Sequence, residues 1–192
     1  MVLSVLVLMG ACAPGETRPE SGQSEGPVEI SFAYQKQTGY ASNQFAVWIE
    51  DGQGELIKTL YASAYTAKGG YKNRPDSIPT WVEKSGLAAM AKQDVDAISG
   101  ATPGAGTLTY YWDLCDAAGD TVAAGEYMFF IEGSLRWKNR VLYSGVISVG
   151  DSVSAAQAQA EYFYEGTQEQ PALTQDAPEN AMITNVAAYV RD

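Results

Sequence analysis

The stretch from Asp96 to Thr102 holds the residues of this chain whose types and spacing are best suited to chemistry. Thr102 offers a hydroxyl, and Gly100 and Ala101 before it carry almost no side chain. Such a segment lets a phosphate and its metal ion approach the backbone, so the hydroxyl can accept a phosphate-linked group. A carboxylate such as Asp96 can hold the metal or orient the hydroxyl. The alternative is a plain surface turn, which the Gly, Pro and Ser content would explain by itself.

The same stretch resembles the flavinylation signal of the FMN-binding domains found in bacterial sodium-pumping and electron-transport complexes. Five positions match the pattern: Asp96, Ser99, Gly100, Ala101 and Thr102. The resemblance implies that Thr102 carries FMN through a phosphoester, placed there by a dedicated flavin transferase. Family signals often continue with a second hydroxyl residue, where this chain has Pro103 and then Gly104.

The composition of the chain limits the chemistry open to it. It has no histidine, which removes the usual general base, the usual haem ligand and the commonest metal ligand. Hydrolysis by a nucleophile-His-acid triad is therefore excluded. Two cysteines are too few for an iron–sulfur cluster or a four-cysteine zinc site, and a net charge of −11 argues against nucleic-acid binding. Redox chemistry here would need an organic cofactor.

The N-terminus looks like a bacterial lipoprotein signal peptide. An apolar run leads into a small-residue box that ends at Cys12. We expect residues 1–11 to be removed, Cys12 to be lipidated, and residues 12–27, rich in Gly, Glu, Ser and Pro, to form a disordered tether. Cys115 would then be a single buried thiol. The alternative is that the apolar run is an ordinary buried strand; it is too short for a transmembrane helix.

From Val28 onward, the sequence alternates and turns like an antiparallel β protein. Strands are predicted at residues 28–34, 44–50, 56–61, 107–113, 125–133 and within 135–150. The second and third form a hairpin through Asp51-Gly52. Between them and the later strands lies a long insertion, in which residues 78–86 read as a short helix that stops at Gly86.

Two resemblances extend this fold prediction. Residues 107–132, with Trp112-Asp113 ending one strand and a Gly-x-Tyr opening the next, resemble the immunoglobulin-like repeat of flagellar hook-capping proteins. Residues 28–190 as a whole are similar to a family of predicted periplasmic proteins of unknown function, domain of unknown function 2271. Together they imply an extracytoplasmic, all-β, immunoglobulin-like antiparallel β-sandwich over residues 28–192, with a long insertion before the central strands.

Three residues outside the motif are candidate flavin contacts: Trp81, Arg136 and Trp137. Trp81 could stack on the flavin ring, and the alternative is that it anchors a loop to the core. Arg136 and Trp137 belong to a basic cluster with Lys138 and Arg140 that could receive the flavin phosphate, although a solvated hairpin face is the alternative. Residues 151–181 contain an alanine-rich run that fits either a helix or a strand.

These features favour a membrane-tethered electron carrier with FMN on Thr102. A flavin transferase would modify it, a membrane redox protein would donate electrons, and the flavin would supply the chemistry. The negative charge predicts a potential below that of free FMN. The alternative is a cofactor-free immunoglobulin-like binding or assembly lipoprotein of the cell envelope. An enzyme is a distant third, because Asp94 and Asp96 would share a strand face without a nucleophile or a pocket.

Overall fold

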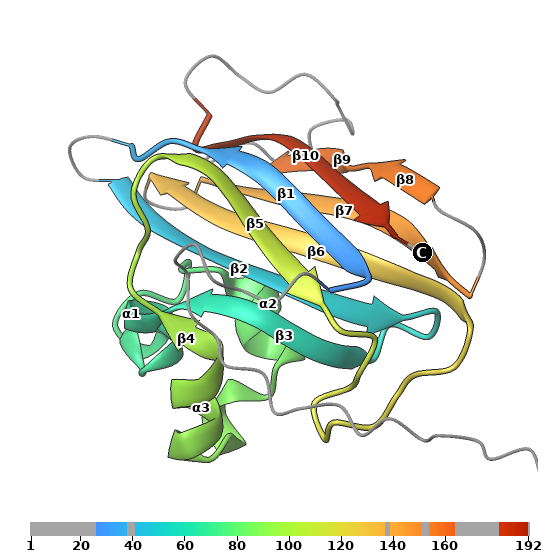
Figure 1. The fold of residues 1–192 in the computed structure, drawn as a ribbon. Helices are drawn as coiled ribbons and strands as arrows, with labels where there is room; N and C mark the ends of the chain where they lie inside the picture. The colour runs from blue at the N-terminus through green and yellow to red at the C-terminus, as the bar shows by residue number, and fades with distance from the viewer. Residues whose placement is uncertain (1–25, 38–40, 137–138, 151–153, 164–180, 192) are drawn as a thin grey trace, which may run out of the picture.

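The chain folds into two β-sheets that pack face to face (Figure 1). The computed structural model describes residues 26–37, 41–136, 139–150, 154–163 and 181–191. The four-stranded sheet has the order β5 (Gly106–Trp112), β1 (Val28–Tyr34), β10 (Ile183–Val190) and β8 (Ser154–Gln157). The six-stranded sheet has the order β4 (Ser99–Gly100), β3 (Leu56–Ser63), β2 (Ala41–Asp51), β6 (Gly125–Arg136), β7 (Arg140–Val149) and β9 (Gln159–Phe163).

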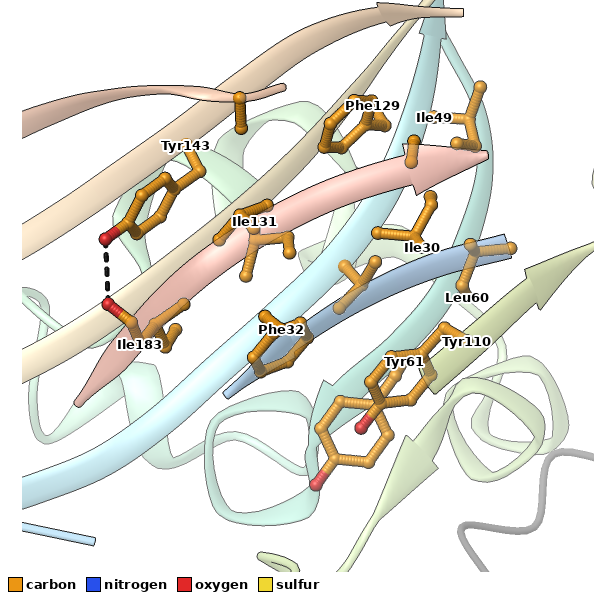
Figure 2. Close-up of a cluster of buried hydrophobic side chains, with 14 of the residues drawn as sticks. Ile30, Phe32, Ile49, Leu60, Tyr61, Tyr110, Phe129, Ile131, Tyr143 and Ile183 are labelled. Carbon is orange, nitrogen blue, oxygen red and sulfur yellow. Dashed lines mark hydrogen bonds between the residues drawn. The ribbon is translucent and has the colours of Figure 1, made fainter. Parts of the chain in front are cut away.

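The main core lies between the sheets and follows from the period-two alternation of the strands. Along β1, every second residue from Val28 to Tyr34 is buried. Side chains from both sheets meet there, including Phe32 from β1 and Phe129 and Ile131 from β6 (Figure 2). Burial of this apolar surface is the main force that holds the sheets together.

A second core lies on the outer face of the six-stranded sheet, beneath the insertion. The insertion consists of α1 (Ala64–Ala67), η1 (Gly70–Lys72), α2 (Pro79–Lys84), η2 (Leu87–Ala89) and α3 (Lys92–Ile98). Phe45, Val47 and Ile49 of β2 point into the main core, whereas Ala46 and Trp48 pack under these helices. The middle of the sheet is therefore covered on both faces.

A buried carboxylate fastens α2 to the sheet. Glu132 of β6 is fully buried and accepts hydrogen bonds from the backbone N–H groups of Trp81 (3.0 Å) and Thr80 (3.3 Å). The Arg140 guanidinium donates to the same carboxylate at 2.8 Å and to the Thr80 hydroxyl at 2.6 Å. The charge of Glu132 is thus paired and its oxygens are satisfied, which is the condition under which a buried carboxylate is tolerated.

The predicted all-β sandwich with a long insertion is confirmed, and the strands predicted from alternation are present. The immunoglobulin-like assignment stays a prediction. The predicted short helix is α2, and Gly86 after it has the left-handed φ of +60° expected of a helix stop. In the undecided alanine-rich run, residues 154–163 form strands β8 and β9.

One local prediction is wrong. Asp94 and Asp96 lie on α3 rather than on a strand. Residues two apart on a helix point to different sides, so the two carboxylates do not share a face. The strand prediction failed because Val95 is the one buried residue of α3, and a single apolar residue between two acidic residues resembles the alternation of a strand.

Candidate functional site

The acceptor segment, residues 99–105, crosses from one sheet to the other at the edge of the sandwich. It begins with β4, the edge strand of the six-stranded sheet, and leads into β5, the edge strand of the four-stranded sheet. Figure 1 shows this connection passing along the open side of the sandwich. Residues 101–104 have no regular secondary structure. The segment is therefore the loop that connects the two sheets at this edge of the sandwich.

The first half of the acceptor segment is held in place by β3. Ser99 and Gly100 pair in parallel with Ala62 and Ser63. The hydroxyl of Tyr61, which precedes them on β3, donates to the carbonyl oxygens of Ala101 (2.9 Å) and Gly100 (3.3 Å). These contacts fix the backbone directly before Thr102.

The second half of the acceptor segment is open. Thr102 and Pro103 are partly exposed, and Ala101 and Gly104 are exposed. No atom lies within 4 Å of the position that a side chain on Gly104 would take. Thr102 thus directly follows a backbone that is held by hydrogen bonds, and it begins a stretch that is accessible to solvent. This position suits a hydroxyl that another protein modifies.

Asp96 lies one turn before the acceptor segment, near the end of α3. Its carboxylate pairs with the ammonium group of Lys68 at 2.8 Å, and both side chains are about half exposed. The hydrogen bond and charge of Lys68, with a smaller contribution from Lys92, lower the pKa of Asp96. Asp96 therefore stays ionised and remains accessible to an incoming cation.

Three tyrosines surround Phe45 on the inner side of this edge. The Phe45 ring lies 4.7 Å from Tyr61, 5.3 Å from Tyr34 and 6.3 Å from Tyr110, measured between ring centroids. The rings of Tyr61 and Tyr110 are 5.3 Å apart, and Figure 2 shows their hydroxyl groups toward the same side. Burial raises the pKa of Tyr34 and of Tyr61 to about 12, and it also raises that of Tyr110. All three are protonated donors at neutral pH.

Some of the hydroxyl groups at this edge lack a partner. Among the residues that the structure describes, three buried side-chain oxygens make no hydrogen bond: Tyr34 Oη, Tyr110 Oη and Ser99 Oγ. Tyr34 lies beside Gly106 in the β1–β5 register, at the point where the acceptor segment enters β5. Gly106 has a φ of +145°, a conformation that favours glycine and leaves no side chain against Tyr34.

The other predicted contacts are not brought to this edge. Trp81 is fully buried in the second core, where its indole N–H donates to the Thr59 hydroxyl at 3.0 Å, so its placement favours the anchoring alternative. Arg136 ends β6, which is separated from β4 by β2 and β3. Trp137 and Lys138 lie outside the described residues. Arg140 is paired with Glu132.

Sequence reasoning did not single out Tyr61, Tyr34, Tyr110 or Lys68. A signal for the tyrosines was present, because each lies at an inward position of a strand, where a buried hydroxyl needs a partner. Lys68 lies 28 positions before Asp96 with short helices between them, so their pairing depends on the path of the insertion. No periodicity could have shown it.

The predicted signal peptide, Cys12 and nearly all of the tether lie outside the described residues. Cys115 is fully buried as expected, with its carbonyl accepting the indole N–H of Trp112 at 2.8 Å, but it is not a free thiol. Within the described ranges, no helix is long and apolar enough to cross a membrane. Nor do the described residues bring together three or more His, Cys, Asp or Glu side chains that could hold a metal ion.

The fold and its edge define a β-sandwich protein with a helical insertion and a small-residue segment that joins its two sheets. The chain belongs to the DUF2271 family, which is described as "Predicted periplasmic protein" and matches residues 25–166. The matched range includes the acceptor segment and strands β1 to β9. Membership supports a location outside the cytoplasm. No significant match was found among curated proteins or among solved structures.

Proposed function

We propose that this protein is an extracytoplasmic electron carrier with FMN joined covalently to Thr102. The observation that carries the proposal is the position of Thr102, partly exposed and directly after a backbone that Tyr61 and β3 hold. The motif resemblance adds a reason for a flavin rather than another phosphate-linked group. The family description adds a reason to place the protein in the periplasm.

Attachment is a phosphoryl transfer onto the Thr102 hydroxyl. The Oγ atom attacks the phosphorus on the FMN side of a flavin dinucleotide, a new O–P bond forms, and the bond to the second phosphate breaks. The nucleoside monophosphate leaves, and the hydroxyl proton passes to a base of the transferase. The small residues Gly100 and Ala101 leave room for the phosphates, and ionised Asp96 can approach the metal ion of the transferase.

The residues at the edge fit a flavin. Thr102 supplies the attachment oxygen, and the hydroxyls of Tyr34 and Tyr110, which have no partner among the described residues, lie on the inner side of the same edge. A bound flavin would supply electron transfer that no side chain here can perform. The protein would hold the cofactor and set the charge around it, and the net charge of −11 disfavours extra negative charge on the ring.

The test is the intact mass of the chain after co-expression with a flavin transferase. We expect an FMN-sized mass increase and in-gel flavin fluorescence for the natural sequence, and neither for Thr102→Ala. The matched control is Thr107→Ala, which removes an exposed threonine on β5, outside the motif. This variant should keep the flavin.

An unmodified chain, with the transferase active on a control substrate, would overturn this function. The cofactor-free binding or assembly lipoprotein would then be the better proposal. Retention of the flavin in Thr102→Ala with loss in Thr107→Ala would place the attachment on β5 and also contradict the proposal.

We further propose that lipidation of Cys12 anchors the carrier to a membrane. The apolar run and the small-residue box that end at Cys12 support this proposal. The state of Cys115, the other cysteine of the sequence, weighs against it, because Cys115 is not a free thiol in the structure. A lipid thioether and a disulfide would compete for the same sulfur of Cys12, so the two exclude each other. Lipid mass on the N-terminal peptide, lost in Cys12→Ser, would support the anchor, whereas a Cys12–Cys115 disulfide in the exported protein would contradict it.

A further inference from the structure

Tyr65 on α1 is the most exposed large apolar side chain among the residues that the structure describes. It is 50% exposed, while the three tyrosines on the inner side of the acceptor edge are buried. A single exposed apolar side chain is common on protein surfaces and by itself needs no explanation. Tyr65 differs from such a residue in how its ring is held and in where it lies.

The Tyr65 ring is packed against the backbone of Gly70 in η1. A Cβ atom on Gly70 would overlap the carbonyl oxygen of Tyr65 and lie 2.5 and 2.7 Å from the ring atoms Cε1 and Cδ1. Only glycine allows so close an approach, and Gly69 before it has a φ of +104°, which also favours glycine. One side of the Tyr65 side chain is thus covered by Gly70, and the rest is open to solvent.

The pairing of β3 with β4 brings Tyr65 and Thr102 to the same end of the six-stranded sheet. The last two residues of β3 pair in parallel with Ser99 and Gly100. Tyr65 and Thr102 each follow two residues after the last pair, and they leave it in the same direction because the strands are parallel. α1 also lies close to β4, and Figure 1 shows it beside the connection that leads from β4 to β5.

The ion pair between Lys68 and Asp96 joins α1 to α3 on this side. Lys68 comes three residues after Tyr65, a spacing that puts two residues on the same side of a helix. The Lys68 ammonium group lies 2.8 Å from the Asp96 carboxylate of α3, and α3 leads directly into β4. The side of α1 that carries Tyr65 is therefore the side that faces α3 and the motif.

An exposed ring held beside the attachment residue suits a second flat ring. Aromatic rings pair by offset stacking, and a ring that is covered on one side leaves room for one partner on the other. The ribityl phosphate that would join the isoalloxazine ring to Thr102 is a chain of single bonds, so the ring can reach a neighbour without a change in the backbone. Attachment also makes the encounter intramolecular, with an effective concentration on the order of millimolar. A contact too weak to capture free FMN can therefore hold the attached ring.

We propose that Tyr65 is a stacking platform on which the isoalloxazine ring carried by Thr102 rests at the surface of α1. This inference rests on the proposed function. The platform needs no internal cavity, because the ring stays on the outer surface with one face on Tyr65. Its other face remains accessible to a redox partner.

Stacking on a tyrosine predicts two optical properties of the attached flavin. A phenol in contact with the excited flavin donates an electron to it, and the electron returns without emission, so the folded protein should fluoresce weakly. A ring held on α1 tumbles with the protein, so its fluorescence anisotropy should be high. Phenylalanine keeps the stacking but is too poor an electron donor to quench the emission, so Tyr65→Phe separates the two properties.

The experiment compares the flavinylated full chain with Tyr65→Ala, Tyr65→Phe and Tyr189→Ala. The control residue Tyr189 is a similarly exposed tyrosine (44%) on β10, in the other sheet. Intact mass gives the FMN occupancy, to which the emission is normalised, and circular dichroism establishes folding. We expect several-fold brighter emission and a loss of anisotropy for Tyr65→Ala, brighter emission with unchanged anisotropy for Tyr65→Phe, and no change for Tyr189→Ala.

Equal emission and anisotropy in the natural chain and in Tyr65→Ala would overturn the platform and leave the proposed function in place. The same changes in Tyr189→Ala would also overturn it, because the effect would not be specific to α1. A loss of anisotropy in Tyr65→Phe would contradict stacking, because the hydroxyl rather than the ring would then hold the flavin. Absence of FMN from every protein would overturn the proposed function together with the platform, and the mass measurement separates this failure from the others.

Discussion

At the scale of single residues, Tyr61 connects the core to the acceptor segment. Its ring stacks on Phe45 inside the sandwich, and its hydroxyl holds the two carbonyls that precede Thr102. The same side chain is thus part of the hydrophobic core and a positioning residue for the proposed attachment. It differs from Tyr110, its neighbour, whose hydroxyl has no partner among the residues that the structure describes.

We predict that Tyr61→Phe slows transfer of FMN to Thr102 without preventing folding. The variant keeps the ring but loses the single hydroxyl proton that the carbonyls of Gly100 and Ala101 share, an interaction worth about 0.5–1.5 kcal/mol. Single-turnover labelling by a flavin transferase would measure the rate, and hydrogen exchange of the amides in residues 99–103 would measure the loosening. Tyr65→Phe, on a half-exposed tyrosine of α1, is the control and should behave like the natural chain.

Tyr110→Phe and Tyr143→Phe should differ in their effect on the stability of the unmodified protein. Tyr143→Phe leaves the carbonyl of Ile183 without its donor, which should cost about 1–3 kcal/mol. Tyr110→Phe removes a buried hydroxyl that has no partner in the described part of the chain and should be neutral or stabilising. Urea denaturation measures both, and a large loss for Tyr110→Phe would show that its hydroxyl is satisfied in solution.

At the scale of elements, Glu132 holds the helical insertion against the six-stranded sheet. It accepts from two backbone amides of α2 and from Arg140, so one side chain connects β6, β7 and α2. The insertion ends with α3, which leads directly into the acceptor segment. A change in this contact therefore reaches the position of Thr102 through the backbone.

We predict that Glu132→Ala destabilises the protein by about 3–5 kcal/mol, because it leaves the partly buried Arg140 charge and two amides unpaired. Glu132→Gln keeps the acceptor oxygen and should lose less. Glu126→Ala, on an exposed residue of the same strand, should change little. Thermal unfolding compares the three, and equal melting temperatures for Glu132→Ala and Glu126→Ala would contradict this role.

The strands could be predicted from the sequence because their alternation is local. Residues 28–34 alternate strictly and form β1 with every second residue buried. The insertion was less predictable: α2 was found from Pro79 and Gly86, whereas α3 was mistaken for alternation around Val95. Short helices carry few periodic residues, and the tertiary contacts that fix them are invisible in sequence.

The candidate site was predictable only in part. The motif residues lie together because they are adjacent in sequence, and the structure adds the partners that are distant in sequence, such as Tyr61 and Lys68. Arg136 and Trp81 were proposed by residue type. Their place in the fold depends on strand order and on which sheet face a residue occupies, and neither follows from composition.

At the scale of the whole molecule, the buried phenols make the stability of the protein fall at alkaline pH. The pKa of Tyr34 and of Tyr61 is raised to about 12 in the folded state from an ordinary value of 10. The folded state therefore holds these protons more tightly than the unfolded state does. The contribution of these phenols to the free energy of unfolding is fully present below pH 10 and is lost as the pH rises from 10 to 12.

We predict that the urea midpoint falls between pH 10 and pH 12, and that the double variant Tyr34→Phe/Tyr61→Phe shows a smaller fall. The comparison is between slopes with pH, because the variant can differ in absolute stability. Spectrophotometric titration of the phenols would show their late ionisation directly. Identical slopes for the two proteins would assign the alkaline loss to other groups.

The two-residue strand β4 has a consequence for self-association. It covers the end of β3, at Ala62 and Ser63, with a parallel partner from the same chain. If residues 99 and 100 left this place, the backbone donors and acceptors of β3 would face solvent and could pair with a strand of another molecule. Because Tyr61 holds the end of β4 through the carbonyls of Gly100 and Ala101, the acceptor segment also protects this end of β3 from pairing with a strand of another molecule.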